Sequence, residues 1–158
     1  MDEVATANSV CFSSCGVRLF AGLDAEYRIF DTQIPGKEST TISLRHQKGI
    51  ISTMVTSSTG VLATGTYNKH IGLYDSESGE QICLMENTHR GGLTQLKFVQ
   101  DNENYLLSGA RKCNRLKVHP ISILTVCSFH ILVLGYEKAN GTCLGGKPRM
   151  FYESTDPI

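Results

Sequence analysis

The chain repeats itself with a period of about 44 residues, and this repeat restricts the fold more than any other feature of the sequence. Residues 10–31 align with residues 53–75 after one residue is added, and residues 96–112 align with both. Gly65 and Gly109 occupy matching positions 44 residues apart. A fixed period of about 20 to 50 residues is typical of proteins that stack copies of one small structural unit. We therefore expect several similar units that pack side by side.

Each unit contains short runs of apolar and alternating residues that are typical of β-strands. Examples are "VRLFAG", "YRIFD", "IISTMV", "VLATG", "LTQLKFV" and "YLLSG", which are separated by clusters of Ser, Gly, Asn and Asp. No stretch before position 113 shows a sustained helical period. Four strands in a unit of about 44 residues are typical of one blade of a β-propeller. The sequence thus predicts an all-β propeller fold.

The second unit resembles a WD repeat. His46 precedes a strand, Asn68 follows a "VLATGT" strand, and Tyr74 stands six residues after Asn68 in a "GLYD" phrase. In WD repeats a His, a Ser or Thr, an Asp or Asn, and an aromatic residue form one hydrogen-bonded set within a blade. The resemblance implies that His46, Thr64, Asn68 and Tyr74 form this set. It gives His89, 43 positions after His46, the same turn-locking role.

The first unit shows the same spacing, because Asp24 lies six residues before Phe30. The Trp that gives the repeat its name is absent, and Phe30 and Tyr74 stand in its place. Asp and Asn side chains bond nearby backbone groups, so we expect Asp24 and Asn68 to stabilise tight turns. Phe30 and Tyr74 are expected to pack between blades.

Longer phrases resemble one particular WD-repeat family. "GIISTMVTSSTGVLATGTYNKHIGLYD", "THRGGLTQLKFVQDNENYLLSGARK" and above all "SGARK" are similar to the middle of the telomerase Cajal body protein family. The resemblance covers residues 8–112. It implies a non-catalytic nuclear scaffold without cofactors, which binds small Cajal-body RNA or telomerase RNA together with ribonucleoprotein proteins and helps deliver these RNAs to Cajal bodies.

The resemblance stops between Lys112 and Cys113. In the family an Asp follows "SGARK" and a third strand comes soon after, whereas here Cys113 and "NRLKVHP" follow. We therefore predict an incomplete WD-repeat propeller of about two and a half blades over residues 8–112, with its third unit cut after the second strand. Residues 113–158 are then a divergent tail, partly disordered. Our hypothesis for the break is an alternative exon, a retained intron or a gene-model error, which makes the chain a truncated isoform.

Physical chemistry limits what such a fragment does alone. A propeller ring typically needs four to eight blades, so the predicted units leave apolar faces and strand edges uncovered. In the tail, residues 121–136 are strongly apolar, but these sixteen residues are fewer than the roughly 20 that a spanning helix needs. We therefore expect no membrane segment there.

Charge gives only a local signal for nucleic acid. Fifteen acidic residues balance fifteen basic ones, so the chain has no overall field that attracts RNA. A basic cluster nevertheless lies within seven positions, and we predict that its family-like members, Arg111 and Lys112, contact RNA. A solvated loop and a nuclear-import patch are the alternatives for this cluster.

Other kinds of function find less support in the sequence. The six cysteines show no C-x-x-C pair and no zinc-site spacing, so we expect no metal. No nucleophile motif or phosphate-binding glycine loop is present, which argues against an enzyme. A generic WD-repeat platform for protein partners remains the main alternative to an RNA-binding scaffold.

Overall fold

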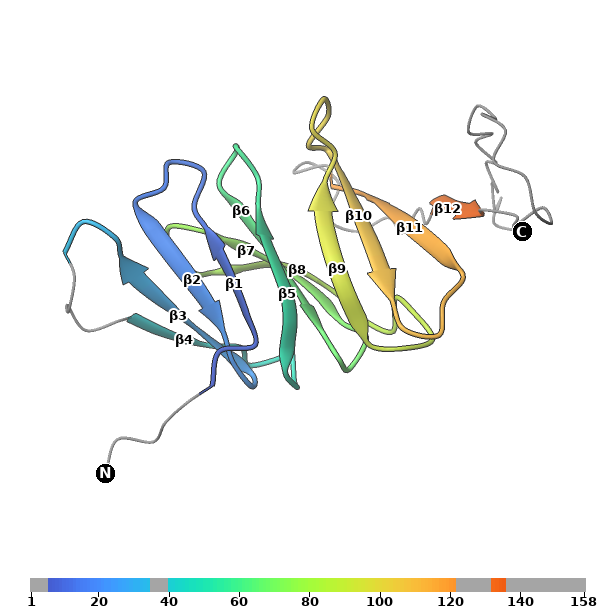
Figure 1. Ribbon diagram of the computed structural model, residues 1–158, viewed down its shortest axis with the longest axis horizontal. Helices are drawn as coiled ribbons and strands as arrows, with labels where there is room; N and C mark the ends of the chain where they lie inside the picture. Colours follow the sequence, from blue (N-terminus) through green and yellow to red (C-terminus); the bar gives the residue numbers. More distant parts are fainter. Residues whose placement is uncertain (1–5, 35–39, 122–131, 136–158) are drawn as a thin grey trace.

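A computed structural model of the chain describes residues 6–34, 40–121 and 132–135, and its regular structure there is entirely β. Three antiparallel sheets of four strands each follow one another along the chain (Figure 1). The first sheet consists of β1 (Ser9–Phe12), β2 (Arg18–Gly22), β3 (Glu26–Asp31) and β4 (Thr40–Ser43). The second consists of β5 (Ile51–Thr56), β6 (Val61–Thr66), β7 (Ile71–Asp75) and β8 (Gln81–Met85). The third consists of β9 (Leu93–Phe98), β10 (Tyr105–Ala110), β11 (Arg115–Pro120) and β12 (Leu132–Gly135).

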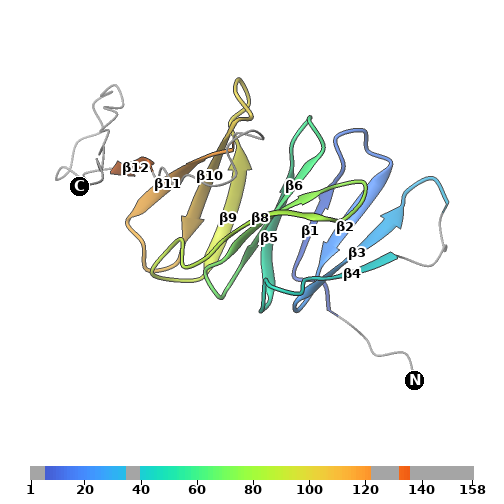
Figure 2. The same cartoon turned by 180° about the vertical axis from the view of Figure 1, so that it is seen from behind.

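The sheets lie side by side as neighbouring blades of an incomplete propeller. Within each sheet the strands pair in sequence order, and the first strands β1, β5 and β9 contact one another from sheet to sheet. Figures 1 and 2 show the three sheets in a row from the front and from behind. The prediction of an all-β, incomplete propeller is confirmed.

The repeat in the sequence is a repeat of strand register. Leu19 pairs with Phe30 in the first sheet, and Leu62 pairs with Tyr74 in the second. Leu106 pairs with His119 at the matching position of the third sheet. The 44-residue period therefore places equivalent side chains at equivalent points of each blade, because the second and third strands pair in the same register in all three sheets.

One hydrophobic core fills each space between two neighbouring sheets. The core between the first and second sheets contains Phe20, Tyr27, Leu44, Ile51, Met54, Leu62 and Tyr74. The core between the second and third sheets contains Val61, Ala63, Ile71, Leu73, Leu93, Leu96, Phe98 and Leu106. Burial of each large apolar side chain contributes about 1.5 to 3 kcal/mol, so contact between blades is the main source of stability.

The third sheet continues beyond the point where the sequence predicts that it stops. β11 pairs with β10, and β12 pairs with β11. The prediction that the third unit ends after its second strand is therefore wrong. The physical reason is that "RLKVHP" still extends as a strand, with Val118 and His119 buried. Whether residues 8–112 and 113–158 are separate regions stays a prediction.

The face of β1 that points away from the second sheet is uncovered in the described structure. Val10 is 61% exposed and Phe12 is 59% exposed, although both are large apolar residues of a strand. This agrees with the expectation that an incomplete ring leaves apolar surface open. Most of the predicted divergent tail, including the apolar run and the part expected to be disordered, lies outside the described residues. Among the residues described, there is no helix with the length and apolar character for a membrane span.

Candidate nucleic-acid interface

A buried hydrogen-bonded set holds the second sheet together, and Gln47 is at its centre. Oε1 of Gln47 accepts a hydrogen bond from Oγ1 of Thr64 at 2.7 Å and another from the hydroxyl of Tyr74 at 2.8 Å. Its Nε2 donates to the backbone oxygen of Thr64 at 3.1 Å. Gln47 is fully buried, so these bonds satisfy groups that water does not reach.

The set differs from the predicted one in two members. Thr64 and Tyr74 belong to it, but His46 is exposed and Gln47, the next residue, takes its place. Both residues lie in the irregular connection between β4 and β5, and of the two side chains only that of Gln47 is buried. Asn68 is also outside the set, since it lies exposed in the β6–β7 turn with its side chain against Gly49.

The third sheet contains a matching set built from different residues. Nε2 of His89 lies 2.7 Å from Oγ of Ser108, and the same Oγ lies 2.7 Å from Nε2 of His119. Burial, together with the charge of Lys117, lowers the pKa of His89 to about 4. Burial, with His89 and Lys117, lowers the pKa of His119 to about 4 as well. Both rings are therefore neutral at pH 7. The sequence pattern does not identify His119 as a member, because "NRLKVHP" lacks the features that indicate a strand. Ser108 lies in the predicted strand "YLLSG", 44 residues after Thr64.

The first sheet lacks such a set among the described residues. Ala21 occupies the place that Thr64 and Ser108 occupy in the other sheets, and it has no hydroxyl to share. Phe30 is half-buried on β3 and belongs to neither core cluster, whereas Tyr74 packs edge-on against Tyr27 at 5.9 Å between ring centres. Asp24 is exposed in the β2–β3 turn and forms a β-bridge with Ile50.

The connections at one end of the sheets carry six of the eleven Lys and Arg residues in the described part of the chain. We call this end the basic rim, and it comprises the described connections 23–25, 44–50, 67–70, 86–92 and 111–114. They contain six basic residues and two acidic ones, which gives a net charge of +4. The basic residues are Arg45, Lys48, Lys69, Arg90, Arg111 and Lys112.

The opposite end has the reverse charge. We call it the acidic rim, and its described connections are 13–17, 32–34, 57–60, 76–80 and 99–104. They contain four acidic residues and no basic one, for a net charge of −4. The balanced total charge of the sequence therefore hides a separation of charge between the two ends. This separation appears only when the topology brings distant turns together.

Backbone hydrogen bonds join the turns of the basic rim into one surface. The amide of Tyr67 donates to the oxygen of Ile50 at 3.1 Å, and the amide of Thr88 donates to the oxygen of Lys69 at 3.0 Å. The amide of Arg111 donates to the oxygen of Gly92 at 2.9 Å. The rim thus continues from the second sheet to the third without a break, and the backbone positions of its turns are fixed relative to one another.

Arg111 and Lys112, the predicted RNA contacts, both lie on this rim but in different surroundings. The guanidinium carbon of Arg111 lies 5.0 Å from the centre of the exposed Tyr67 ring, which is the distance of a cation–π contact. Lys112 is exposed at the β10–β11 turn, with a φ of 57°. The structure brings Arg111 next to an aromatic ring that the sequence did not connect with it.

Two glycines allow this close packing. A Cβ on Gly91 would lie 2.0 Å from the backbone oxygen of Arg111, and a Cβ on Gly92 would lie 2.7 Å from the backbone oxygen of Tyr67. No larger residue fits at either position without moving the loop. The "RGG" segment is therefore a spacer between the β6–β7 and β10–β11 turns.

No group of three or more His, Cys, Asp or Glu side chains in the described part of the chain is arranged to hold a metal ion. Nε2 of each buried histidine, His89 and His119, lies within hydrogen-bond distance of the hydroxyl of Ser108. The rim is a positively charged surface with the exposed ring of Tyr67 in it.

Comparison with known proteins shows which proteins the chain is similar to. The chain is 42% identical over 117 residues to telomerase Cajal body protein 1 of Bos taurus, which is 71% of this chain and 21% of that protein. The chain is a homologue of telomerase Cajal body protein 1. The protein of that name from Homo sapiens is 38% identical over 117 residues, and a Drosophila melanogaster homologue is 31% identical over 122 residues. The chain spans about one fifth of the length of these relatives.

Solved structures support the fold independently. The WD40 repeats of RRP9 match 77% of this chain with a TM-score of 0.65 and 17% identity. A chain of the mitotic checkpoint complex matches 78% of it with the same TM-score and 21% identity. Each match covers 37% of the solved chain, as expected for part of a propeller. No family model matches the sequence. The homology and the fold together identify part of a WD40 propeller that is similar to telomerase Cajal body protein 1.

Proposed function

We propose that the chain is a non-catalytic RNA-binding scaffold and that the basic rim is its RNA-binding surface. By similarity to telomerase Cajal body protein 1, its partners are small Cajal-body RNA or telomerase RNA with their ribonucleoprotein proteins, and its location is the Cajal body of the nucleus. The same similarity supports a truncated isoform of such a scaffold. The observation that carries the proposal is the net charge of +4 on connected turns at one end of the sheets.

Charge of this kind suits a phosphate backbone. RNA binding depends strongly on contacts between phosphates and Lys or Arg, and these contacts release counterions. The acidic rim repels RNA, so the charge separation also orients the chain on its ligand. The exposed ring of Tyr67 beside Arg111 offers a surface on which an unpaired base stacks.

One observation favours a second function, a platform for protein partners. Val10 and Phe12 expose apolar surface on β1, and such a surface is typical of a protein contact. That contact uses the first sheet, whereas the basic rim runs through all three. The two functions are therefore separable by mutation.

The test is binding of a box-containing guide RNA to the full chain, measured by fluorescence anisotropy at several salt concentrations. We expect affinity to fall linearly on a logarithmic plot against salt, with a slope of about −0.7 for each phosphate contact to single-stranded RNA. The variant Arg111→Ala/Lys112→Ala loses two contacts, so its slope is expected to be shallower by about 1.4.

The matched control changes charge on the acidic rim. Glu77→Ala/Glu103→Ala removes two charges of the opposite sign and leaves the basic rim intact. We expect its salt slope to equal that of the unmodified chain. Equal slopes for all three proteins, or a loss of slope in the acidic-rim variant alone, would contradict the proposed RNA surface.

A further inference from the structure

The first sheet exposes apolar side chains at positions that are buried in the third sheet. By strand register, Val10 of β1 corresponds to Leu96 of β9, and both are apolar. In the same way Phe12 corresponds to Phe98. Leu96 and Phe98 are each 5% exposed because they pack in the core against the second sheet, whereas Val10 and Phe12 are about 60% exposed. We call the face of the first sheet that carries Val10 and Phe12 the leading face.

The third sheet exposes apolar side chains at positions that are buried in the second. Tyr105 of β10 corresponds by register to Val61 of β6, and Leu116 of β11 corresponds to Ile71 of β7. Val61 and Ile71 are buried in the core between the second and third sheets. Tyr105 and Leu116 are 41% and 47% exposed. We call the face of the third sheet that carries Tyr105 and Leu116 the trailing face.

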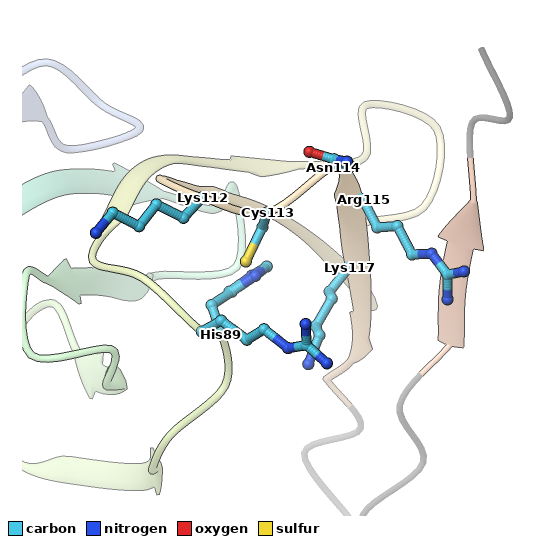
Figure 3. A pocket seen from close by; sticks show the side chains of 7 residues that line it. His89, Lys112, Cys113, Asn114, Arg115 and Lys117 are labelled. Carbon is cyan, nitrogen blue, oxygen red and sulfur yellow. The ribbon is translucent and has the colours of Figure 1, made fainter.

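The trailing face points away from the second sheet. Lys117 extends from β11 toward the connection that carries His89 (Figure 3). His119 lies two residues further along the same side of β11, and it pairs with Leu106, which lies in the core against the second sheet. Side chains alternate along a strand, so Leu116 points to the opposite side. The leading and trailing faces are therefore the two outer faces of the row of sheets.

A hydroxyl near the start of the first strand crosses each of the two contacts between sheets. Oγ of Ser9 in the first sheet donates to the backbone oxygen of Ile51 in the second at 2.9 Å. Oγ of Ser52 in the second sheet donates to the backbone oxygen of Leu93 in the third at 2.6 Å. The same type of bond therefore accompanies the apolar packing at both contacts.

The third sheet has a hydroxyl at the same position. Thr94 is the extra residue at a shift of register in β9, as Ser52 is in β5. Thr94 is exposed, and its Oγ1 donates to the backbone oxygen of Gly109 in its own sheet at 3.2 Å. Asn8 precedes the first strand of the first sheet as Leu93 precedes Thr94. A first sheet placed against the trailing face would bring the backbone oxygen of Asn8 to the hydroxyl of Thr94.

We propose that two copies of the chain join head to tail, with the trailing face of each packed on the leading face of the other, as a closed ring of six sheets. The two faces are complementary because they repeat the two halves of the contact that holds the second sheet to the third. Every copy carries both halves, so a second copy covers both open faces. Six sheets lie within the typical range of about four to eight blades in a propeller.

This inference goes beyond the proposed RNA-binding function and does not depend on it. A head-to-tail contact produces a ring if the rotation closes and an open filament if it does not. In a closed ring of two copies both contacts are identical, and no leading or trailing face stays exposed. Rotation about the ring axis also keeps the basic rims of both copies at the same end.

Sedimentation velocity of the full chain, without RNA, measures the assembly. We expect one species with twice the mass of the chain, which dissociates into single chains on dilution. Single chains at every concentration, or a series of assemblies that grows beyond two copies, would overturn the ring. A chain that pairs in this assay but binds no guide RNA rejects the RNA surface and keeps the ring.

Two charge variants test which faces meet. Phe12→Lys changes the leading face and Tyr105→Glu changes the trailing face, and both positions are exposed in the single chain. Their counterparts Phe98 and Val61 lie in one core and line one hollow, so we expect residues 12 and 105 to meet across the new contact. Each variant alone would form two defective contacts. We expect each to keep the circular dichroism of a β-protein and to lose at least about tenfold in dimer affinity.

An equimolar mixture of the two variants is the decisive sample. A mixed dimer has one unmodified contact and one contact in which the introduced lysine meets the introduced glutamate. We expect the mixture to dimerise although neither variant does so alone. Ile34→Lys is the matched control, because Ile34 is 52% exposed but lies outside both faces, and it is expected to dimerise normally. A mixture that stays monomeric, or equal dimerisation by all three variants, contradicts the proposed contact.

Discussion

Nε2 of His89 lies 2.7 Å from Oγ of Ser108, and both side chains are buried between the loop before β9 and the centre of β10. The bond joins residues 19 positions apart and fixes the start of the third sheet to its second strand. Gln47 and Thr64 make the equivalent connection in the second sheet. Two different chemical pairs therefore perform one structural task in neighbouring blades.

We expect the side-chain amide of Gln47 to be essential for stability and the side chain of its neighbour His46 to contribute little. Gln47→Ala leaves the buried hydroxyls of Thr64 and Tyr74 without their shared acceptor and creates a small cavity. We expect a loss of about 3 kcal/mol in the free energy of unfolding, measured with urea. His46→Ala changes an exposed side chain and is expected to alter stability by less than about 0.5 kcal/mol. A similar loss of unfolding free energy in both variants would show that Gln47 is not the centre of the hydrogen-bonded set.

The paired histidines predict that stability falls in weak acid. Burial lowers the pKa of His89 and of His119 to about 4, below the ordinary value of 6.5. Between these values the unfolded chain binds more protons, so stability is complete above pH 6.5 and decreases toward pH 4. Each histidine contributes a slope of at most about 1.4 kcal/mol per pH unit.

Urea unfolding at pH 7.5, 6, 5 and 4.5 measures this effect. The variant His119→Tyr places at this position the residue type that Tyr74 supplies in the second sheet, and it removes one titrating group. We expect its stability to depend less on pH than that of the unmodified chain. Identical pH profiles for the two proteins would show that His119 does not titrate with folding.

The glycine spacer predicts a specific steric effect. Gly91→Ala forces the added Cβ against the backbone oxygen of Arg111, so the loop must move and the bond from Arg111 to Gly92 weakens. We expect a loss of about 1 to 3 kcal/mol in stability and weaker RNA binding. Gly109→Ala is the matched control, because its nearest neighbour is at 3.4 Å. Calorimetric melting of both variants gives the comparison.

The ring of Tyr67 is expected to support RNA binding through Arg111. Tyr67→Ala removes the surface on which the guanidinium lies and on which a base stacks, so affinity should fall by about 1 to 3 kcal/mol. Tyr67→Phe keeps the ring and is expected to bind almost normally. Anisotropy titrations with the same RNA measure both affinities. If Tyr67→Phe binds as weakly as Tyr67→Ala, the hydroxyl and not the ring is responsible.

The sequence predicts the blades well because each copy of the sequence repeat folds into one four-stranded sheet. Strand pairs such as Leu62 with Tyr74 recur at the period of the sequence, so aligned turns and apolar runs are enough to identify the sheets. The sequence does not predict β11, because its alternation is short, contains Lys117 and His119, and ends at Pro120. Tertiary packing against β10 decides its conformation, and local sequence carries little of that information.

The candidate site was less predictable for two reasons. Sequence places a histidine near the correct position but does not tell which of two adjacent side chains faces the core, and the structure selects Gln47 over His46. The six basic residues of the basic rim are spread over four connections from residue 44 to residue 114. A linear scan finds Arg111 and Lys112 and misses Arg45 and Lys69, because only the fold gathers them at one end.

The central claim is that RNA binds at the end of the sheets where these basic connections meet. Ultraviolet crosslinking of a 4-thiouridine-labelled guide RNA to the full chain, followed by mass spectrometry of the peptides, tests it most directly. We predict crosslinks in peptides that contain Tyr67, His89 to Gly92 and Arg111 to Arg115. Crosslinks confined to the acidic rim or to the exposed face of β1 would contradict the account.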